Sequence, residues 1–196
     1  SLLVPVAAMA HECRFSAERD FDVDVAGLAS VAFALGSSDV TVEGVPGLAK
    51  VEVRGKVCAS DQAWLVGITV DQQRAGDRLT ITPHEDRTAN WSWFGSSYAY
   101  MDLRVRVPAK LAVNIKGSSG DAEVSGVAAL SFDTRSGDLQ VRHIAGALSI
   151  QVSSVDVTGD DVGSGAVQLT WSGSISLLQW PGDVQCGRSS AGAVTF

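Results

Sequence analysis

Apolar and polar residues alternate along most of the chain with a period of two. The alternation is clearest in the short stretches 31–35, 40–42, 51–53, 65–70, 79–81 and 103–107. The breaks between them are rich in Gly, Pro, Asp and Ser, which favour turns. A period of two places successive side chains on opposite faces of a strand, and the helical period of 3.6 is nearly absent. The sequence therefore predicts an all-β fold of many short strands.

From residue 111 onward the alternation becomes a repeat. Aligned copies start at Leu111, Leu130, Leu148 and Val167. Each copy has two short apolar stretches separated by a turn of Ser-Gly-Asp type, complete at 119–121 and 136–138. Stacked copies would bury the same side of every strand. We therefore predict a single-domain β-solenoid, similar to a parallel β-helix, with coils of about 18 residues.

Three apolar columns run through the aligned copies and predict the core. They are Val113, Phe132, Ile150, Leu169 and Cys186; Val124, Val141, Val157 and Leu177; and Val127, Ile144, Val162 and Trp180. Residues 11–110 show the same chemistry less regularly. We expect them to form an irregular β cap and wider coils at the N-terminal end of the regular repeats, residues 111–196.

The first ten residues form a short apolar segment that ends in Ala8-Met9-Ala10. Small residues at these positions are typical of a signal peptidase site. We interpret residues 1–10 as the remnant of a secretory signal peptide, which leaves 11–196 as the domain; the other interpretation is a short N-terminal strand. The sequence has no run of roughly 20 apolar residues that could form a membrane helix. We expect a protein exported to the periplasm or the cell surface of a bacterium.

The chain has three cysteines, Cys13, Cys58 and Cys186. Export permits disulfide formation. Because Cys186 falls in a predicted core column, the simplest assignment is a Cys13–Cys58 disulfide with Cys186 as a buried free thiol. The other two pairings stay open. The Cys and His residues lack the spacing of a zinc site, and we expect no metal and no cofactor.

Composition narrows the class of partner. The 196 residues carry a formal net charge of −7, and 45% of them are hydrophobic. A folded acidic domain is a poor partner for nucleic acid, because binding to phosphate needs a basic face.

One segment together with the repeats carries a family resemblance. The strand 103–108, Leu-Arg-Val-Arg-Val-Pro, precedes several Ser-Gly-Asp turns at intervals of 17 to 19 residues. This pattern, from Phe21 to the end, resembles a bacterial adhesin family with Ser-Gly-Asp repeats, similar to autotransporter adhesin heads. The resemblance implies an exported, parallel β-solenoid without catalytic residues.

Three groups of polar residues are candidates for chemistry. Asp121 and Asp138, with Asp39 as a further member, could bind calcium, but Asp after Gly also accepts hydrogen bonds from neighbouring backbone amides, which we favour. The carboxylates Asp160 and Asp161, with His143 as a base, are the material for a carbohydrate-active enzyme. Adjacent acids in a turn point in different directions, so we expect no enzyme.

A cluster of aromatic residues is the strongest candidate for a contact site. It comprises Trp91, Trp93, Phe94, Tyr98 and Tyr100, in a Gly- and Ser-rich context. Such side chains stack on sugar faces or anchor a protein partner. They could equally cover the end or flank of the solenoid.

Together these observations predict a non-enzymatic exported protein of the cell envelope, an adhesin or structural binding module with a repetitive surface. Its partner would be an envelope protein or a glycan, and edge-to-edge self-association is a further expectation. The alternative is an envelope-stress or regulatory partner-binding protein. A carbohydrate-active β-helix enzyme is the least favoured reading.

Overall fold

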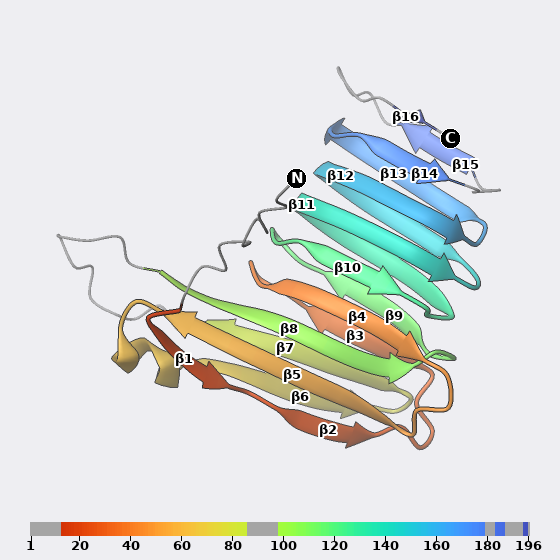
Figure 1. Ribbon diagram of the computed structural model, residues 1–196. Helices are drawn as coiled ribbons and strands as arrows, with labels where there is room; N and C mark the ends of the chain where they lie inside the picture. Colours follow the sequence, from red (N-terminus) through yellow and green to blue (C-terminus); the bar gives the residue numbers. More distant parts are fainter. Residues whose placement is uncertain (1–12, 86–97, 179–182, 187–193, 196) are drawn as a thin grey trace, which may run out of the picture.

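The computed structural model describes residues 13–85, 98–178, 183–186 and 194–195. Within these ranges it contains sixteen strands and one 3₁₀-helix, which confirms the all-β prediction. All sixteen strands belong to one hydrogen-bonded sheet. This sheet curls over its own apolar side into an open half-barrel with two facing flanks (Figure 1).

Two long strands connect the flanks, and their first and second halves lie in different flanks. They are β11 (Ala129–Ile144) and β12 (Leu148–Val162). The first half of β11 pairs with β9 (Ala112–Lys116), and its second half pairs with β10 (Ala122–Ser125). The first half of β12 pairs with β13 (Gly165–Ser172), and its second half with β14 (Ile175–Leu178).

The front flank in Figure 1 begins with antiparallel strands and continues with parallel ones. Both β1 (Phe15–Glu18) and β2 (Phe21–Asp24) pair with β5 (Lys50–Ala59), and β5 pairs antiparallel with β8 (Ala99–Pro108). From β8 onward all pairings are parallel, through β4 (Asp39–Val45), β10, the second halves of β11 and β12, β14 and β16 (Val194–Thr195).

The rear flank has the same organisation. An antiparallel pair, β6 (Ile68–Ala75) and β7 (Arg78–Glu85), forms its edge. Parallel pairings then follow through β3 (Ser30–Ala34), β9, the first halves of β11 and β12, β13 and β15 (Asp183–Cys186). The 3₁₀-helix η1 (Gln62–Gly67) contacts β1 and β5 of the front flank and β6 of the rear flank.

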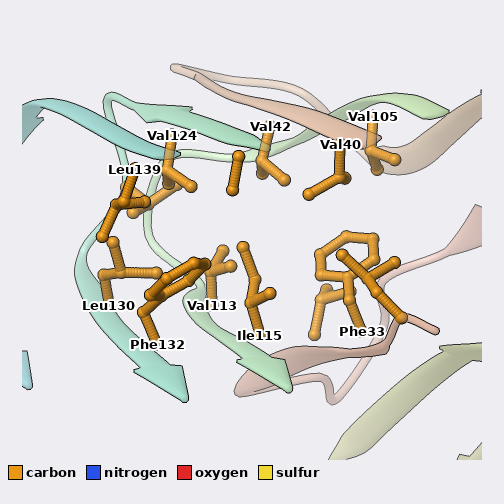
Figure 2. Close-up of a cluster of buried hydrophobic side chains, with 14 of the residues drawn as sticks. Phe33, Val40, Val42, Val105, Val113, Ile115, Val124, Leu130, Phe132 and Leu139 are labelled. Carbon is orange, nitrogen blue, oxygen red and sulfur yellow. The ribbon is translucent and has the colours of Figure 1, made fainter. Parts of the chain in front are cut away.

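The core lies between the two flanks. Figure 2 shows Val40, Val42 and Val124 of the front flank pointing toward Phe33 and Phe132 of the rear flank. All five side chains are buried. The polar residues that alternate with them face outward, so these strands have the one buried and one exposed side that their sequence predicts.

The expected β-solenoid is corrected to a half-barrel, a single open curled sheet. The repeat pattern predicts a turn at 136–138, yet β11 runs without interruption from Ala129 to Ile144. Gly137 adopts a φ of 111°, which bends the strand while its pairing with β12 continues. Because β11 and β12 pass through their bends, they join the two flanks into one sheet.

The predicted core columns are partly wrong in register, but all of their members whose burial the structure describes are buried, as predicted. The structure confirms the pairs Phe132–Ile150, Val124–Val141 and Ile144–Val162. It places Val113 opposite Leu130 instead of Phe132, and Val141 opposite Gly159 instead of Val157. Each error is two residues, so the buried side of the strand is unchanged.

The order of strands in space differs from their order in the chain. The pair β3–β4 comes early in the sequence but lies between β7–β8 and β9–β10 (Figure 1). Strands from both sides of residue 110 therefore belong to the same sheet. The division into 11–110 and 111–196 stays a prediction, and the signal segment 1–10 lies outside the described residues.

Candidate binding surface

A row of five aspartates crosses the outer face of the front flank. They are Asp102 on β8, Asp39 on β4, Asp121 directly before β10, Asp138 on β11 and Asp156 on β12. Strand register makes each one the neighbour of the next. We call this row the aspartate ladder. Each aspartate precedes a buried apolar residue, so its own side chain points away from the core.

Backbone amides of the neighbouring strands hold the ladder in place. Asp39 Oδ1 accepts a hydrogen bond from Asp121 N (2.8 Å), and Asp121 Oδ1 accepts one from Asp138 N (2.9 Å). Asp156 Oδ1 accepts from both Ser174 N (2.7 Å) and Ser174 Oγ (2.8 Å). These contacts agree with the turn role expected for Asp39 and Asp121, in which a carboxylate accepts a hydrogen bond from a neighbouring backbone amide.

The two ends of the ladder differ in their electrostatics. Burial, followed by the negative charge of Asp39, raises the pKa of Asp102 above its usual value, against the smaller influence of Lys56 and Arg104. Hydrogen bonds from Ser174 lower the pKa of Asp156 below its usual value. Ionisation is therefore disfavoured at the Asp102 end and favoured at the Asp156 end.

A shallow groove of about 670 Å³ follows the ladder across five strands. Beside the aspartates it is lined by Thr41, Arg104, Glu123, Gln140, Thr158 and Ser174. These polar side chains are largely exposed, and the groove is also lined by the buried apolar residues that follow the aspartates, Val40, Leu103, Ala122 and Leu139. All of these residues belong to, or directly adjoin, a continuous hydrogen-bonded sheet. The groove can therefore offer charges and hydrogen-bonding groups at fixed positions about 4.8 Å apart, the spacing of neighbouring strands.

Two tyrosines from the predicted aromatic cluster lie near the Asp102 end of the groove. Tyr98 and Tyr100 have ring centroids 6.1 Å apart with an interplanar angle of 36°. Tyr98 is 36% exposed, and its hydroxyl accepts a hydrogen bond from Arg14 N (3.2 Å). Burial, followed by the charge of Asp102, raises the pKa of Tyr100. The other members, Trp91, Trp93 and Phe94, lie outside the described residues.

The predicted Cys13–Cys58 disulfide is present, with the Cα atoms 5.2 Å apart. It attaches the segment before β1 to the end of β5, where Cys58 lies opposite Tyr100 of β8. The disulfide thus fixes the N-terminal segment beside the tyrosine pair. The free thiol at Cys186 stays a prediction.

The structure brings together His143 and Asp161, two residues of the hypothetical enzyme site. His143 Nδ1 lies 2.7 Å from Asp161 Oδ2, and both side chains are exposed. Both residues have positive φ angles, 53° and 51°, at the bend where β11 and β12 approach their ends. Asp160 is instead the register partner of Arg142. The His143–Asp161 contact thus links the bend of β11 to the neighbouring bend of β12.

The described part of the chain contains neither a candidate metal site nor a candidate membrane helix. No group of three or more His, Cys, Asp or Glu side chains in this part could hold a metal ion. Among the same residues, no helix has the length and apolar character needed to cross a membrane.

Sequence analysis grouped Asp39, Asp121 and Asp138 but missed the ladder members Asp102 and Asp156, although a signal exists. The ladder aspartates begin similar segments, Asp-Leu-Arg-Val at 102, Asp-Val-Thr-Val at 39, Asp-Ala-Glu-Val at 121, Asp-Leu-Gln-Val at 138 and Asp-Val-Thr-Gly at 156. In all five segments the aspartate is followed by an apolar residue, then a polar residue, then a small or apolar residue. The same pattern also occurs off the ladder, for example at Asp22 and Asp183, so it marks candidate members without stating which strands are neighbours.

Comparisons with known proteins give only distant structural matches. No family model and no curated protein matches the chain. A solved structure of a "putative cell adhesion protein" from Clostridium sporogenes is 14% identical, with a TM-score of 0.47, covering 92% of this chain and 98% of that one. A "putative adhesin" from Bacteroides fragilis is 12% identical, with a TM-score of 0.42, covering 93% of each chain. A "putative lipid binding protein" from Parabacteroides distasonis is 15% identical, with a TM-score of 0.40, covering 92% and 93%.

Proposed function

We propose that the protein is an exported, non-enzymatic binding module of adhesin type, and that its contact surface is the groove along the aspartate ladder. The observation that carries this proposal is the register of the ladder. Several of its side chains are held by hydrogen bonds to the backbone of the next strand, so the surface is ordered before any partner arrives. Preorganisation of this kind lowers the entropy cost of binding.

The geometry of the carboxylates favours binding over glycoside hydrolysis. Hydrolysis needs two carboxyl groups on opposite sides of the scissile bond, one of them a proton donor. The ladder carboxylates instead lie side by side on one face of one sheet. This arrangement presents the carboxylates to one side of a ligand in the groove, which favours binding.

The disulfide supports the proposed export. Disulfides form and persist mainly in oxidising compartments such as the periplasm and the cell surface. Cys58 is 1% exposed, and its bond to Cys13 fastens the segment that leads into β1. This arrangement is suited to a protein that works outside the cytoplasm.

The alternative function, a regulatory protein that binds its partner through the aromatic cluster, is favoured by the partial exposure of Tyr98 at one end of the groove. The two functions place the contact surface differently. A groove-based module contacts its partner over five strands, whereas the alternative needs only the tyrosine end. Substitution of Tyr98 by Ala should abolish binding under the alternative and weaken it under our proposal.

The test is binding of the labelled protein to isolated bacterial cell envelopes. Thr41→Trp places a bulky side chain in the groove at an exposed position. Ser149→Trp is the matched control, because Ser149 is exposed on the outer face of the rear flank. We expect Thr41→Trp to reduce envelope binding and Ser149→Trp to leave it unchanged. Equal binding by the two variants would contradict the proposal.

A further inference from the structure

The groove carries an excess of negative charge on a largely exposed face of the sheet. Its lining contains the five ladder aspartates and Glu123, against a single cation, Arg104. Of these, Glu123 already forms an ion pair with Arg142 (3.2 Å), as Glu52 outside the groove does with Arg106 (2.9 Å). Within the described residues, no ladder carboxylate forms an ion pair with Lys, Arg or His. Unneutralised charge is thus concentrated along the ladder.

The hydrogen bonds of the ladder restrict what kind of cation fits. Asp39, Asp121 and Asp156 each use Oδ1 to accept from a backbone amide. At these three residues Oδ1 already accepts a hydrogen bond, whereas Oδ2 accepts none within the described residues. A guanidinium group binds best to both oxygens of a carboxylate, whereas an ammonium group needs only one acceptor at each contact. The ladder therefore suits the ammonium groups of lysine better than arginine.

We propose that the groove binds an extended, lysine-rich segment of a partner protein; this inference rests on the proposed function and names its partner class. The argument is charge complementarity between the groove and the segment. Lysine carries its charge on a flexible four-carbon stem, so successive side chains can adapt to a row of carboxylates on a twisted sheet. The tyrosine pair beside Asp102 adds aromatic faces that attract an ammonium group.

The experiment measures the affinity of a short oligolysine peptide for matched charge variants. The ladder variant carries Asp39→Asn, Asp121→Asn and Asp138→Asn. Asparagine keeps an Oδ1 acceptor, so the backbone contacts are retained. The control variant carries the same change at three exposed aspartates off the front flank, Asp71, Asp77 and Asp133. Both variants change the formal net charge from −7 to −4, so general electrostatic attraction is the same in each.

We expect the ladder variant to bind oligolysine about tenfold more weakly than the control variant at low salt, because three exposed ion pairs are lost. Added salt should remove most of this difference. Thermal melts check that both variants are folded. Thr41→Trp blocks the same groove while leaving every charge in place, so it tests the binding site independently of charge. Equal affinity of the ladder and control variants, or unchanged oligolysine binding by Thr41→Trp, overturns the inference.

Two further probes test the partner class. Oligoarginine of the same length should bind no more tightly than oligolysine. An oligomer of glucosamine that binds as tightly as oligolysine, and only to the intact ladder, would assign the groove to an amino-sugar polymer and overturn the lysine assignment. If Thr41→Trp reduces envelope binding while the ladder variant does not, the proposed function stands and the lysine inference fails. If oligolysine binding depends on the ladder but envelope binding ignores Thr41→Trp, the proposed function fails.

Discussion

Asp102 and Asp156, at the two ends of the ladder, lie in opposite electrostatic environments. The pKa of Asp102 is raised, chiefly by burial, whereas hydrogen bonds from Ser174 lower the pKa of Asp156. The folded chain therefore binds the proton of Asp102 more tightly than the unfolded chain does, and the proton of Asp156 less tightly. By linkage, ionised Asp102 destabilises the fold at neutral pH, and ionised Asp156 stabilises it.

This contrast predicts opposite effects of the same substitution. Asp102→Asn should raise the melting temperature at pH 7, and the gain should vanish at acidic pH, below the unfolded value near 3.9, where the wild-type carboxyl is protonated in both states. Asp156→Asn should lower the melting temperature at pH 7, and this loss should shrink as the pH falls below about 4. Melting curves of the three proteins at pH 3 and pH 7 provide the measurement. Shifts of the same sign at pH 7 would contradict the assignment.

Thr134 is a second residue with a clear energetic consequence. Its side chain is 6% exposed, and in the part of the chain that the structure describes its hydroxyl has no hydrogen-bond partner. Thr134→Val replaces this hydroxyl by a methyl group of the same shape, beside Val152 on β12. We expect a gain of about 1–3 kcal/mol, measured by urea unfolding. Thr134→Ser keeps the hydroxyl and removes the methyl, so it should destabilise; a gain with Ser would contradict the explanation.

The role of individual aspartates was partly predictable from sequence. Aspartate in a turn accepts hydrogen bonds from nearby amides, and Asp121 does so. The membership of Asp102 was not predictable by the same route, because it follows Met101 within a strand, without a preceding glycine. Its place in the ladder depends on which strand lies beside β8, which no local feature of the sequence states.

At the scale of strands, periodicity determines the buried face but leaves the register open. Alignment by spacing placed Val141 opposite Val157, whereas the structure places it opposite Gly159. A Cβ atom on Gly159 would lie 2.5 Å from Val141 Cγ2 and 2.8 Å from Leu177 Cδ2. The larger side chains of the adjacent strands fill the space that glycine leaves. Complementary volume between strands therefore contributes to register, and it is invisible in the alternation of one strand.

If the repeats serve packing, a substitution in the core of β11 should destabilise the protein far more than a substitution at the bend of β11. Val141 is 0% exposed, between Val124 and Gly159. Val141→Asp buries an unpaired charge and should cost several kcal/mol. Asp138→Ala keeps the backbone amide that bonds to Asp121, so it should cost no more than about 1 kcal/mol.

The measurement for this pair is thermal unfolding with added calcium and with a chelator. Both variants should respond to calcium and to the chelator as the wild type does, with no change in melting temperature. Equal destabilisation by the two substitutions, or a lower wild-type melting temperature in chelator, would instead identify the ladder as a metal site.

At the scale of the whole molecule, sequence predicted the class of fold and not its topology. Every strand of the front flank has similar alternation, so several pairings satisfy the same local pattern. The placement of β3–β4 between β7–β8 and β9–β10 depends on long-range packing. The joining of both flanks into one sheet depends likewise on bends such as Gly137, which a sequence pattern cannot distinguish from turns.

At the N-terminal end of the half-barrel, side-chain contacts of Arg19 link the two edges of the sheet. Arg19, between β1 and β2, donates hydrogen bonds to the carbonyl oxygens of Ile68 (2.8 Å) and Leu65 (2.5 Å). These contacts connect the front-flank edge to η1 and β6 of the rear flank. At the far end of β6, Gln72 and Arg74 stand opposite buried core residues, and polar side chains at such positions discourage pairing with a foreign strand.

The disulfide and Arg19 hold the same edge, so their contributions to stability should be coupled. Reduction of Cys13–Cys58 frees a closed loop with a sequence separation of 45 residues and should cost about 2–4 kcal/mol. Arg19→Lys loses the forked donor and leaves carbonyl groups unsatisfied, at about 1–3 kcal/mol in the oxidised protein. Reduction should loosen β1 and so weaken the contribution of the Arg19 hydrogen bonds. Arg19→Lys should therefore reduce the stability of the reduced protein less than that of the oxidised protein. Urea unfolding of wild type and Arg19→Lys, each oxidised and reduced, completes the cycle. Additive losses in the four measurements would mean that the disulfide and Arg19 stabilise separate parts of the molecule.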